Sequence, residues 1–379
     1  MPNLVRIKNR VDWVLFVSAL LISLLGILSM YSFTVSEAGT ENALAIRQMI
    51  WLAVSIGVFF GASLIDWRFL RHTASVMAVY GFATLMLILL FITGSIFQGA
   101  QSWFNFGAFA VQPSDPAKLA LIIVLAKYFS RRHIEIAHLK HIGISGLYAL
   151  VLFVLIFLQP DFGGAVIIAL VWGGMVLLAG IPFRRLILLA AAGTAGFFFL
   201  WTFVFAPYQQ ERIITFLHPL ADIEGAGYHA FQSTIAVGSG GLLGKGIGYG
   251  TQSRLQFLPE HETDFIFATF AEEWGFGGVL LLFALFGAIF WRLISNAKMG
   301  ATNFETLFTL GVAVLIASHG IIHVGMNIGL LPVTGLPLSF MSYGGSHLVT
   351  AYLMLGMVSG MRRYGRTVHS DARHEVVGA

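Results

Sequence analysis

Long apolar runs recur from one end of the chain to the other, and short polar segments separate most of them. A helix needs about 20 apolar residues to cross the roughly 30 Å hydrocarbon core of a bilayer. The pattern predicts an all-α polytopic integral membrane protein, one domain over 1–379, with about ten transmembrane helices at 13–33, 46–65, 73–94, 115–129, 143–158, 162–180, 184–206, 265–291, 304–327 and 344–362. The fourth and fifth runs are short, so we expect them to extend into their polar flanks or to cross obliquely.

The basic residues indicate how these helices are oriented. With ten spans and a cytoplasmic N-terminus, five of the 22 Lys and Arg residues lie on the outer side: Arg47, Lys118, Arg212, Lys245 and Arg254. Cytoplasmic loops of membrane proteins carry an excess of Lys and Arg. The bias therefore predicts that both termini are cytoplasmic and that the large loop 207–263, between the seventh and eighth helices, is extracytoplasmic.

Composition excludes several classes of function. The chain is 57% hydrophobic and has no cysteine, which removes disulfides, thiolate catalysis and Cys-ligated metal sites. Its net charge of +4 comes from Lys and Arg residues at the cytoplasmic ends of the helices. The charge therefore indicates contact with anionic lipid headgroups and not with nucleic acid. The glycine run GSGGLLGKGIGYG at 238–250 could approach phosphate oxygens, but it lacks the P-loop pattern and a preceding strand, so we expect no nucleotide.

Polar residues gather in three segments on the predicted outer side: 99–119, 207–263 and 327–348. The long loop interleaves aromatic and apolar residues with its glycines, which favours a folded loop resting on the membrane over a flexible linker. The segment 327–348 contains prolines and paired glycines. Broken backbone at membrane depth is tolerated where it is buried in protein or lines a watery cavity.

Asp264 is the first candidate for chemistry, because it lies at the mouth of the eighth helix beside Glu260 and Glu262. Partial burial and neighbouring carboxylates would raise its pKa toward that of a useful general base. The alternative is that Asp264 only caps the helix, as Asp commonly does in this position. Glu272 and Glu273 lie about two turns further in, and each either faces a functional cavity or forms a structural pair.

The remaining polar candidates also have two interpretations each. Asp115 and Lys118 are either a local ion pair or part of the same cavity as Asp264, with the ammonium presented to a phosphate. Arg212 is either a headgroup anchor or a pyrophosphate clamp. Asp161 should cap the sixth helix. His319 and His323 have the i, i+4 spacing of metal ligands, but without an HExxH pattern we expect a packed, hydrogen-bonded pair.

Four segments together resemble one family. AQSWFNFGAFAVQPSDPAKL (100–119), LQPDFGGA (158–165), the loop ending in LQFLPEHETDFIFA (255–268) and GLLPVTGLPLSFMSYGGSHL (329–348) match, in order and spacing, the SEDS family (shape, elongation, division and sporulation) over essentially all ten helices. Two departures stand out: Asp115 and Pro116 follow QPS where the family usually has Glu, and the order HETD places Glu262 beside Thr263.

The resemblance implies a peptidoglycan glycosyltransferase of the bacterial inner membrane that polymerises lipid II during cell-wall elongation, with the extending lipid-linked glycan as second substrate. It implies a class B penicillin-binding protein as partner, among other membrane proteins of the elongation complex. The family's essential aspartate falls on Asp264. We expect the substrate to contact Gln112, Ser114, Asp115, Lys118, Arg212, Gln232, Ser233, Lys245 and Glu260, with Glu272 and Asp161 in supporting positions.

For the mechanism we expect Asp264 to deprotonate the acceptor sugar hydroxyl while cations hold the leaving pyrophosphate. The cations are Lys118, Arg212 and a divalent ion, Mg²⁺ or Mn²⁺, whose ligands the sequence does not identify; no organic cofactor is expected. The competing hypothesis is a flippase that moves lipid II across the membrane. A flippase should carry polar residues through to the inner side, whereas here they cluster on the outer side.

Overall fold

The computed structural model describes residues 11–377, apart from 35–42, 98–99, 106, 108–109, 132–138, 181, 206, 218–225, 255–257 and 259. Ten of its helices correspond to the ten expected spans: α2 (Trp13–Thr34), α3 (Ala43–Leu64), α4 (Thr73–Thr93), α5 (Ser114–Ser130), α6 (Leu139–Leu158), α7 (Phe162–Leu178), α8 (Phe183–Phe203), α12 (Ile266–Lys298), α13 (Asn303–Asn327) and α14 (Gly345–Val377). The all-α polytopic prediction is confirmed.

The fourth and fifth spans, both expected to be short, differ in length. The fifth extends into its polar flank and becomes the 20-residue α6, as expected, whereas α5 keeps 17 residues. Most of α5 is buried, because it packs against α4, α6, α7, α13 and α14. Six described helices, α2, α3, α4, α6, α12 and α13, are long and apolar enough to cross a membrane by themselves, and α7 and part of α8 are shorter apolar helices.

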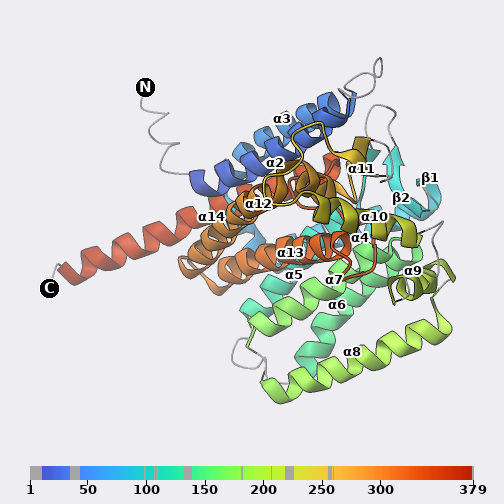
Figure 1. The fold of residues 1–379 in the computed structure, drawn as a ribbon. Coiled ribbons are helices and arrows are strands. Elements are labelled where there is room, and N and C mark those ends of the chain that lie inside the picture. The colour runs from blue at the N-terminus through green and yellow to red at the C-terminus, as the bar shows by residue number, and fades with distance from the viewer. Residues whose placement is uncertain are drawn as a thin grey trace.

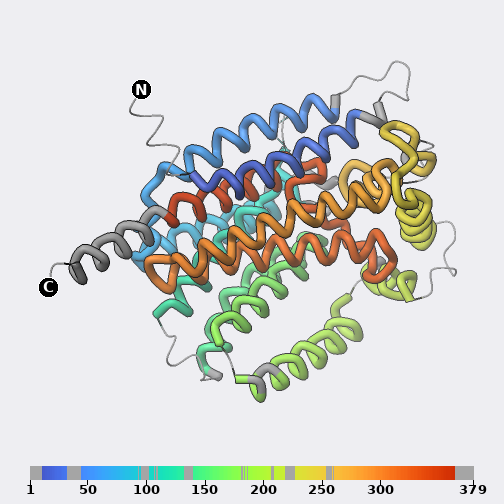
Figure 2. Tube along the Cα trace, turned by 60° about the vertical axis from the view of Figure 1, so that its left-hand side comes forward, coloured from blue at the N-terminus to red at the C-terminus, as the bar shows by residue number. Residues whose placement is uncertain are grey.

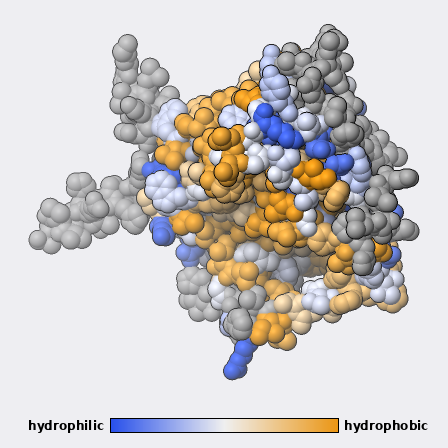
Figure 3. Space-filling view, in the orientation of Figure 1, coloured by the Kyte–Doolittle hydropathy of each residue, from blue (hydrophilic) through white to orange (hydrophobic). Residues whose placement is uncertain are grey.

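The helices α2, α12 and α13 run side by side, and α8 lies at the edge of the bundle (Figures 1 and 2). Hydrophobic side chains cover much of the middle of the visible face (Figure 3). Large apolar side chains are exposed on α8, including Leu188, Phe198 and Phe203. Such faces are stable in lipid, which is as apolar as the side chains.

Smaller elements form between the spans. The long loop contains α9 (Pro207–Leu217), α10 (Ala226–Ser239) and α11 (Thr251–Arg254), so the expectation of a folded loop is confirmed for its described part. The 3₁₀ helix η1 (Trp67–Arg71) precedes α4. A three-stranded antiparallel sheet, which the apolar pattern did not predict, joins β1 (Ser95–Phe97), β2 (Ala100–Asn105) and β3 (Ala110–Val111). Its register pairs Ser95 with Trp103 and Phe104 with Val111.

Asp12 fastens three helices at the end of the bundle opposite Asp264. Its carboxylate accepts hydrogen bonds from Arg292 (2.7 Å), Asn296 (2.9 Å) and Arg362 (3.1 Å), and its backbone N–H donates to Ser359 Oγ at 3.0 Å. These partners lie on α12 and α14, so the start of α2 is held to both. Nearby in the fold, Arg71 pairs with Glu305 at 2.6 Å.

Removal of the Asp12 carboxylate should destabilise the bundle. Asp12→Ala leaves Arg292 and Arg362 largely buried without their counter-ion, which typically costs about 3–5 kcal/mol. We expect a clear fall in the melting temperature of the purified protein in detergent. The matched control is Asp66→Ala, because Asp66 pairs with Arg68 at 2.6 Å with both side chains more than half exposed, and such pairs contribute about 1 kcal/mol or less. Equal melting temperatures for the two variants would contradict the role of Asp12.

Candidate active site

Asp264 ends a tight turn that leads into α12. Glu260 begins the turn at φ +51°, and its carbonyl accepts the backbone N–H of Asp264 at 3.0 Å. Asn327, at the end of α13, donates its side-chain N–H to the Asp264 carbonyl at 2.9 Å. The N-cap of α12 is Phe265 and makes no side-chain cap bond. The capping interpretation of Asp264 is therefore wrong, and its carboxylate is available for another role.

The surroundings of Asp264 favour a proton acceptor. Burial and the charge of Glu260 raise the pKa of the Asp264 carboxyl to about 6, with a smaller contribution from Glu262, while Arg212 opposes the rise. A carboxylate with such a pKa can both accept and release protons near neutral pH. Gly335, at φ +72°, lies against it, since a Cβ there would be 3.5 Å from Asp264 Oδ2. A Cβ at 335 would touch this carboxylate at an ordinary van der Waals distance, and the positive φ favours glycine there.

Asp115 and Lys118 form a second centre, buried inside the bundle. Lys118 Nζ lies 3.1 Å from Asp115 Oδ1, and the side chains are only 5% and 2% exposed, so this is not the weak surface pair that spacing alone suggested. Ser346 donates to Asp115 Oδ2 at 2.8 Å, and His347 Nδ1 lies 3.4 Å from Oδ1. The shorter Asp side chain at this position still reaches its partners. Buried ions need such partners, because their desolvation is costly.

Residues around the second centre connect it to α7. Asp161 caps α7 as predicted, with Oδ1 accepting the Gly164 N–H at 2.7 Å, and its Oδ2 accepts from the Gln112 side chain at 3.3 Å. Ser114 is buried, and its side chain lies close enough to Asp161 to stabilise that carboxylate. Gln112, Ser114 and Asp161 thus lie together, as the sequence predicted for the first two.

The irregular segment 331–344 joins the two centres. Besides Gly335, it contributes Ser342, which donates to the Thr263 carbonyl at 2.8 Å, and Tyr343, whose N–H donates to the Glu262 carbonyl at 2.9 Å. The helix that follows it begins with Ser346 and His347. No hydrogen bond or ion pair between described residues joins Asp264 to Lys118 directly. The segment 331–344 thus contacts the turn that carries Asp264, and the helix that follows it contacts Asp115.

The glycine run packs against α12, so the structure assigns its glycines to helix contact and not to a phosphate cradle. Lys245 N–H donates to the Glu272 carbonyl and Gly246 N–H to that of Glu273, both at 3.0 Å. A Cβ at Gly244 would lie 2.1 Å from the Glu273 carbonyl oxygen. The helix itself breaks at Gly275, where φ is +64°. The two backbone segments lie so close together at Gly244 that no side chain fits between them.

Glu272 and Glu273 bind the same loop. Glu272 is fully buried, and its Oε1 accepts from Lys245 Nζ at 2.7 Å and from Thr251 N–H at 2.9 Å. Glu273 Oε1 accepts from Gly248 N–H at 2.9 Å. Both hold the loop to α12, as the structural alternative predicts. Lys245, expected at the substrate, has its ammonium committed to Glu272 and 28% of its side chain exposed.

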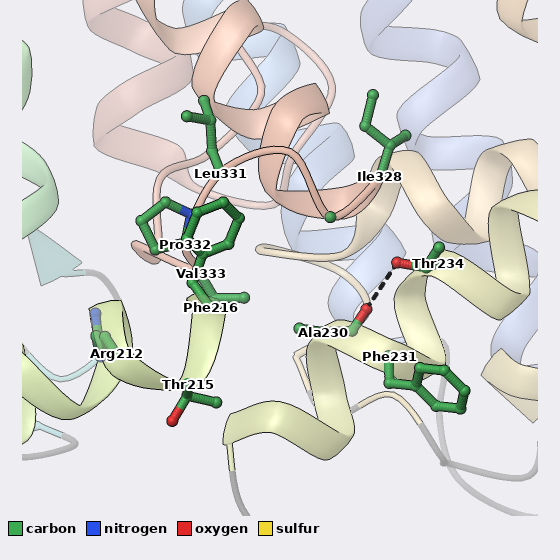
Figure 4. A pocket seen from close by; sticks show the side chains of 11 residues that line it. Arg212, Thr215, Phe216, Ala230, Phe231, Thr234, Ile328, Leu331, Pro332 and Val333 are labelled. Carbon is green, nitrogen blue, oxygen red and sulfur yellow. Dashed lines mark hydrogen bonds between the residues drawn. The ribbon is translucent and has the colours of Figure 1, made fainter. Parts of the chain in front are cut away.

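Arg212 lines a cavity of about 220 Å³ between α9, α10 and the start of the irregular segment. The other lining residues are mainly apolar, including Phe216, Phe231 and Pro332, and Arg212 stands at one side of the space (Figure 4). Glu260, which also acts on Asp264, is exposed, and its carboxylate accepts from Thr263 at 3.3 Å. Arg212 is thus a cation within electrostatic reach of Asp264.

Ser233 and Gln232, both on α10 and both expected to contact the substrate, differ in their hydrogen-bond partners. Ser233 is buried and donates to the Asn327 carbonyl at 2.9 Å, so it supports the residue that holds Asp264. Gln232 is partly buried, and its Oε1 has no hydrogen-bond partner among the described residues. Sequence reasoning missed Asn327, Ser346 and His347. All three stand in the segment 327–348, but nothing in the pattern indicated that Asn327 holds Asp264 or that Ser346 and His347 contact Asp115.

The two other histidines are packed as expected. His319 Nδ1 lies 3.1 Å from the Pro337 carbonyl, and His323 Nδ1 lies 2.7 Å from the Leu336 carbonyl. Both hold the irregular segment to α13. Among the described residues, no group of three or more His, Asp or Glu side chains could hold a metal ion.

A long apolar groove begins beside the cavity and runs between α12 and α13. It has a volume of about 600 Å³, and Ile328 and Leu331 line both spaces. Phe283 and Phe286 line it on α12, with Ala317 and Gly320 on α13. The groove lies among the membrane-spanning parts of the two helices.

The model of the FtsW, RodA and SpoVE cell cycle protein family matches residues 11–367. The chain belongs to the SEDS family. It is 34% identical over 366 residues to stage V sporulation protein E of Bacillus subtilis (strain 168), covering 95% of this chain and 99% of that one. It is 38% identical over 287 residues to the peptidoglycan glycosyltransferase MrdB of Escherichia coli (strain K12), covering 76% of this chain and 77% of that one.

Solved structures of SEDS proteins share the fold. A chain of a peptidoglycan synthase complex that coordinates polymerisation and crosslinking superposes with a TM-score of 0.79 at 30% identity, covering 94% of this chain and 98% of that one. RodA of Thermus thermophilus superposes with a TM-score of 0.69 at 29% identity, covering 93% and 97%. This SEDS chain is therefore a multi-pass membrane protein, and the similarity extends through the site.

Proposed function

We propose that this SEDS protein is a peptidoglycan glycosyltransferase that polymerises lipid II on the extracytoplasmic side of the bacterial inner membrane during cell-wall elongation. The observation that carries the proposal is Asp264, a partly buried carboxylate with a pKa of about 6 that does not cap its helix. The similarity to MrdB, a peptidoglycan glycosyltransferase, supports it.

In the proposed reaction, Asp264 removes the proton from the 4-hydroxyl of the incoming glucosamine. The oxygen attacks the anomeric carbon of the growing chain, the bond from that carbon to the pyrophosphate oxygen breaks, and the configuration inverts. The pyrophosphate leaves with the bonding electron pair, and Lys118 and Arg212 stabilise its charge. A pyrophosphate is already a good leaving group, so one base and two cations suffice and no strong general acid is needed.

The proposed reaction does not require the protein to bind a divalent ion of its own. The described residues offer no cluster of three or more metal-ligating side chains that could hold Mg²⁺ or Mn²⁺ without the substrate. Such an ion would reach the site with the pyrophosphate of the substrate. The proposed chemistry of the chain therefore rests on Asp264, Lys118 and Arg212.

The charged residues at the end of the bundle opposite Asp264 do not favour the flippase hypothesis. The buried carboxylates described there are paired, Asp12 with Arg292 and Arg362, and Glu305 with Arg71. A polar headgroup crossing the membrane would need polar groups free to receive it at that end. The enzyme hypothesis needs none.

Asp264→Asn tests the proposed base. Asparagine keeps the size of the side chain but cannot accept the proton, so polymerisation of purified lipid II should fall by about 10²-fold or more. Melting temperature should not fall. Lys118→Ala should also reduce the rate strongly, whereas Lys127→Ala at the opposite end of α5 should not. A folded Asp264→Asn protein that polymerises lipid II at nearly the wild-type rate would overturn the proposal.

We propose that the partner is a class B penicillin-binding protein and that its transmembrane helix packs in the groove between α12 and α13. The similar synthase complex coordinates polymerisation with crosslinking, which supports a crosslinking partner for this chain. Small residues let two membrane helices approach closely, and Ala317 and Gly320 supply them in this groove.

Gly320→Leu tests this assignment. A Cβ at Gly320 meets nothing within 4 Å, so the larger side chain fills the groove without clashing inside the protein. We expect co-purification of the partner to fall at least tenfold while the melting temperature of the isolated chain is kept. The control is Gly81→Leu on α4, where a Cβ also meets nothing within 4 Å. Equal partner recovery for wild type and both variants would place the partner elsewhere.

A further inference from the structure

Binding of a pyrophosphate to Lys118 would take away the cation that Asp115 is paired with. Its ammonium is already paired with Asp115 at 3.1 Å, and both side chains are buried. When Lys118 turns to the pyrophosphate of the substrate, Asp115 loses its main counter-ion inside the bundle. An ionised carboxylate left in that position without a cation is costly, because water cannot replace the lost partner.

His347 stands where a replacement cation is needed. Its Nδ1 lies 3.4 Å from Asp115 Oδ1, the same oxygen that Lys118 contacts. A carboxylate only accepts hydrogen bonds, so Nδ1 carries the hydrogen and Nε2 carries the lone pair of the neutral ring. Nε2 is buried and has no hydrogen-bond partner among the described residues.

His319 provides a matching acceptor. Its Nδ1 lies 3.1 Å from the Pro337 carbonyl, so it also donates there and leaves a lone pair on Nε2, again without a described partner. The ring centroids of His319 and His347 are 4.8 Å apart. Two imidazole rings joined by one N–H···N bond have centroids about 5 Å apart. The two Nε2 atoms form no hydrogen bond with each other in the described structure, so one added proton on His347 Nε2 would satisfy both lone pairs once the two rings turn toward each other.

We propose, on the basis of the proposed function, that His347 is a positioning residue that takes up one proton when a lipid-linked pyrophosphate binds Lys118. The proton comes from solvent and goes to Nε2; Lys118 remains an ammonium and Asp115 remains a carboxylate, now paired with the imidazolium. The proton leaves again with the pyrophosphate product. The titratable groups that face His347 are Asp115 and Lys118 on α5 and His319 and His323 on α13.

The test is the KM for lipid II between pH 6 and pH 8.5. Uptake of one proton on binding makes the wild-type KM rise by up to about tenfold per pH unit on the alkaline side. His347→Asn retains a donor to Asp115 but cannot become a cation, so its KM should be at least tenfold above wild type at pH 6 and independent of pH. Its kcat should stay within about threefold of wild type once the enzyme is saturated.

Two further variants serve as controls. His319→Gln keeps an acceptor for His347 Nε2 and should retain the rise in KM with pH, whereas His319→Leu should weaken it. His141→Asn changes another buried histidine, bonded to Tyr128 near the other end of α5, and should leave the pH dependence intact. A wild-type KM that does not change with pH, or a rise that survives in His347→Asn, would overturn the inference.

Calorimetry separates this inference from the proposed function. Binding of farnesyl pyrophosphate at pH 8, measured in two buffers of different ionisation enthalpy, should take up about one proton more in wild type than in His347→Asn. The titration of the ligand itself cancels in that difference. A difference of zero contradicts the role of His347 whether or not lipid II is polymerised. Failure of wild type to polymerise lipid II contradicts the proposed function alone.

Discussion

The need to partner buried carboxylates determines how the backbone folds at the Asp264 end of the bundle. Asp115, Glu272 and Asp161 are each surrounded by donors that come from distant parts of the chain. For Glu272 the donors come from the glycine run after α10. For Asp115 they come from Ser346 and His347 at the start of α14, and for Asp161 from Gln112 just before α5. Buried carboxylates need such partners, because their desolvation is costly.

Asp264 differs from Asp115 and Glu272, because two neighbouring carboxylates oppose its charge. Glu260 and Glu262 repel it and burial desolvates it, while Arg212 only partly compensates. Its main-chain atoms, by contrast, are held firmly by Glu260 and Asn327. A fixed backbone with a poorly stabilised charge is what a general base requires. In the proposed function, the well-paired carboxylates hold segments of the fold together, and the poorly paired Asp264 accepts the proton.

Helices were predictable from sequence because each depends on a local apolar pattern. The ten spans, the cap at Asp161 and the packed pair His319 and His323 all follow from periodicity and spacing. The sheet at 95–111 was missed because its strands are two to six residues long. The close contact of Gly244 with Glu273 was also missed, since it joins two segments whose approach depends on tertiary structure. The partners of Asp115 on α14 lie more than 230 residues away, and no local signal indicates them.

The central claim is that the ionisation of Asp264 controls the chemical step, and the pH dependence of kcat for lipid II polymerisation tests it most directly. A base must be deprotonated, so with a pKa of about 6 in the folded protein, kcat should be constant above pH 7 and fall toward one tenth near pH 5. The residual activity of Asp264→Asn should show no such fall. A wild-type kcat that is unchanged between pH 5 and pH 8, at saturating lipid II and with the protein folded throughout, would contradict the account.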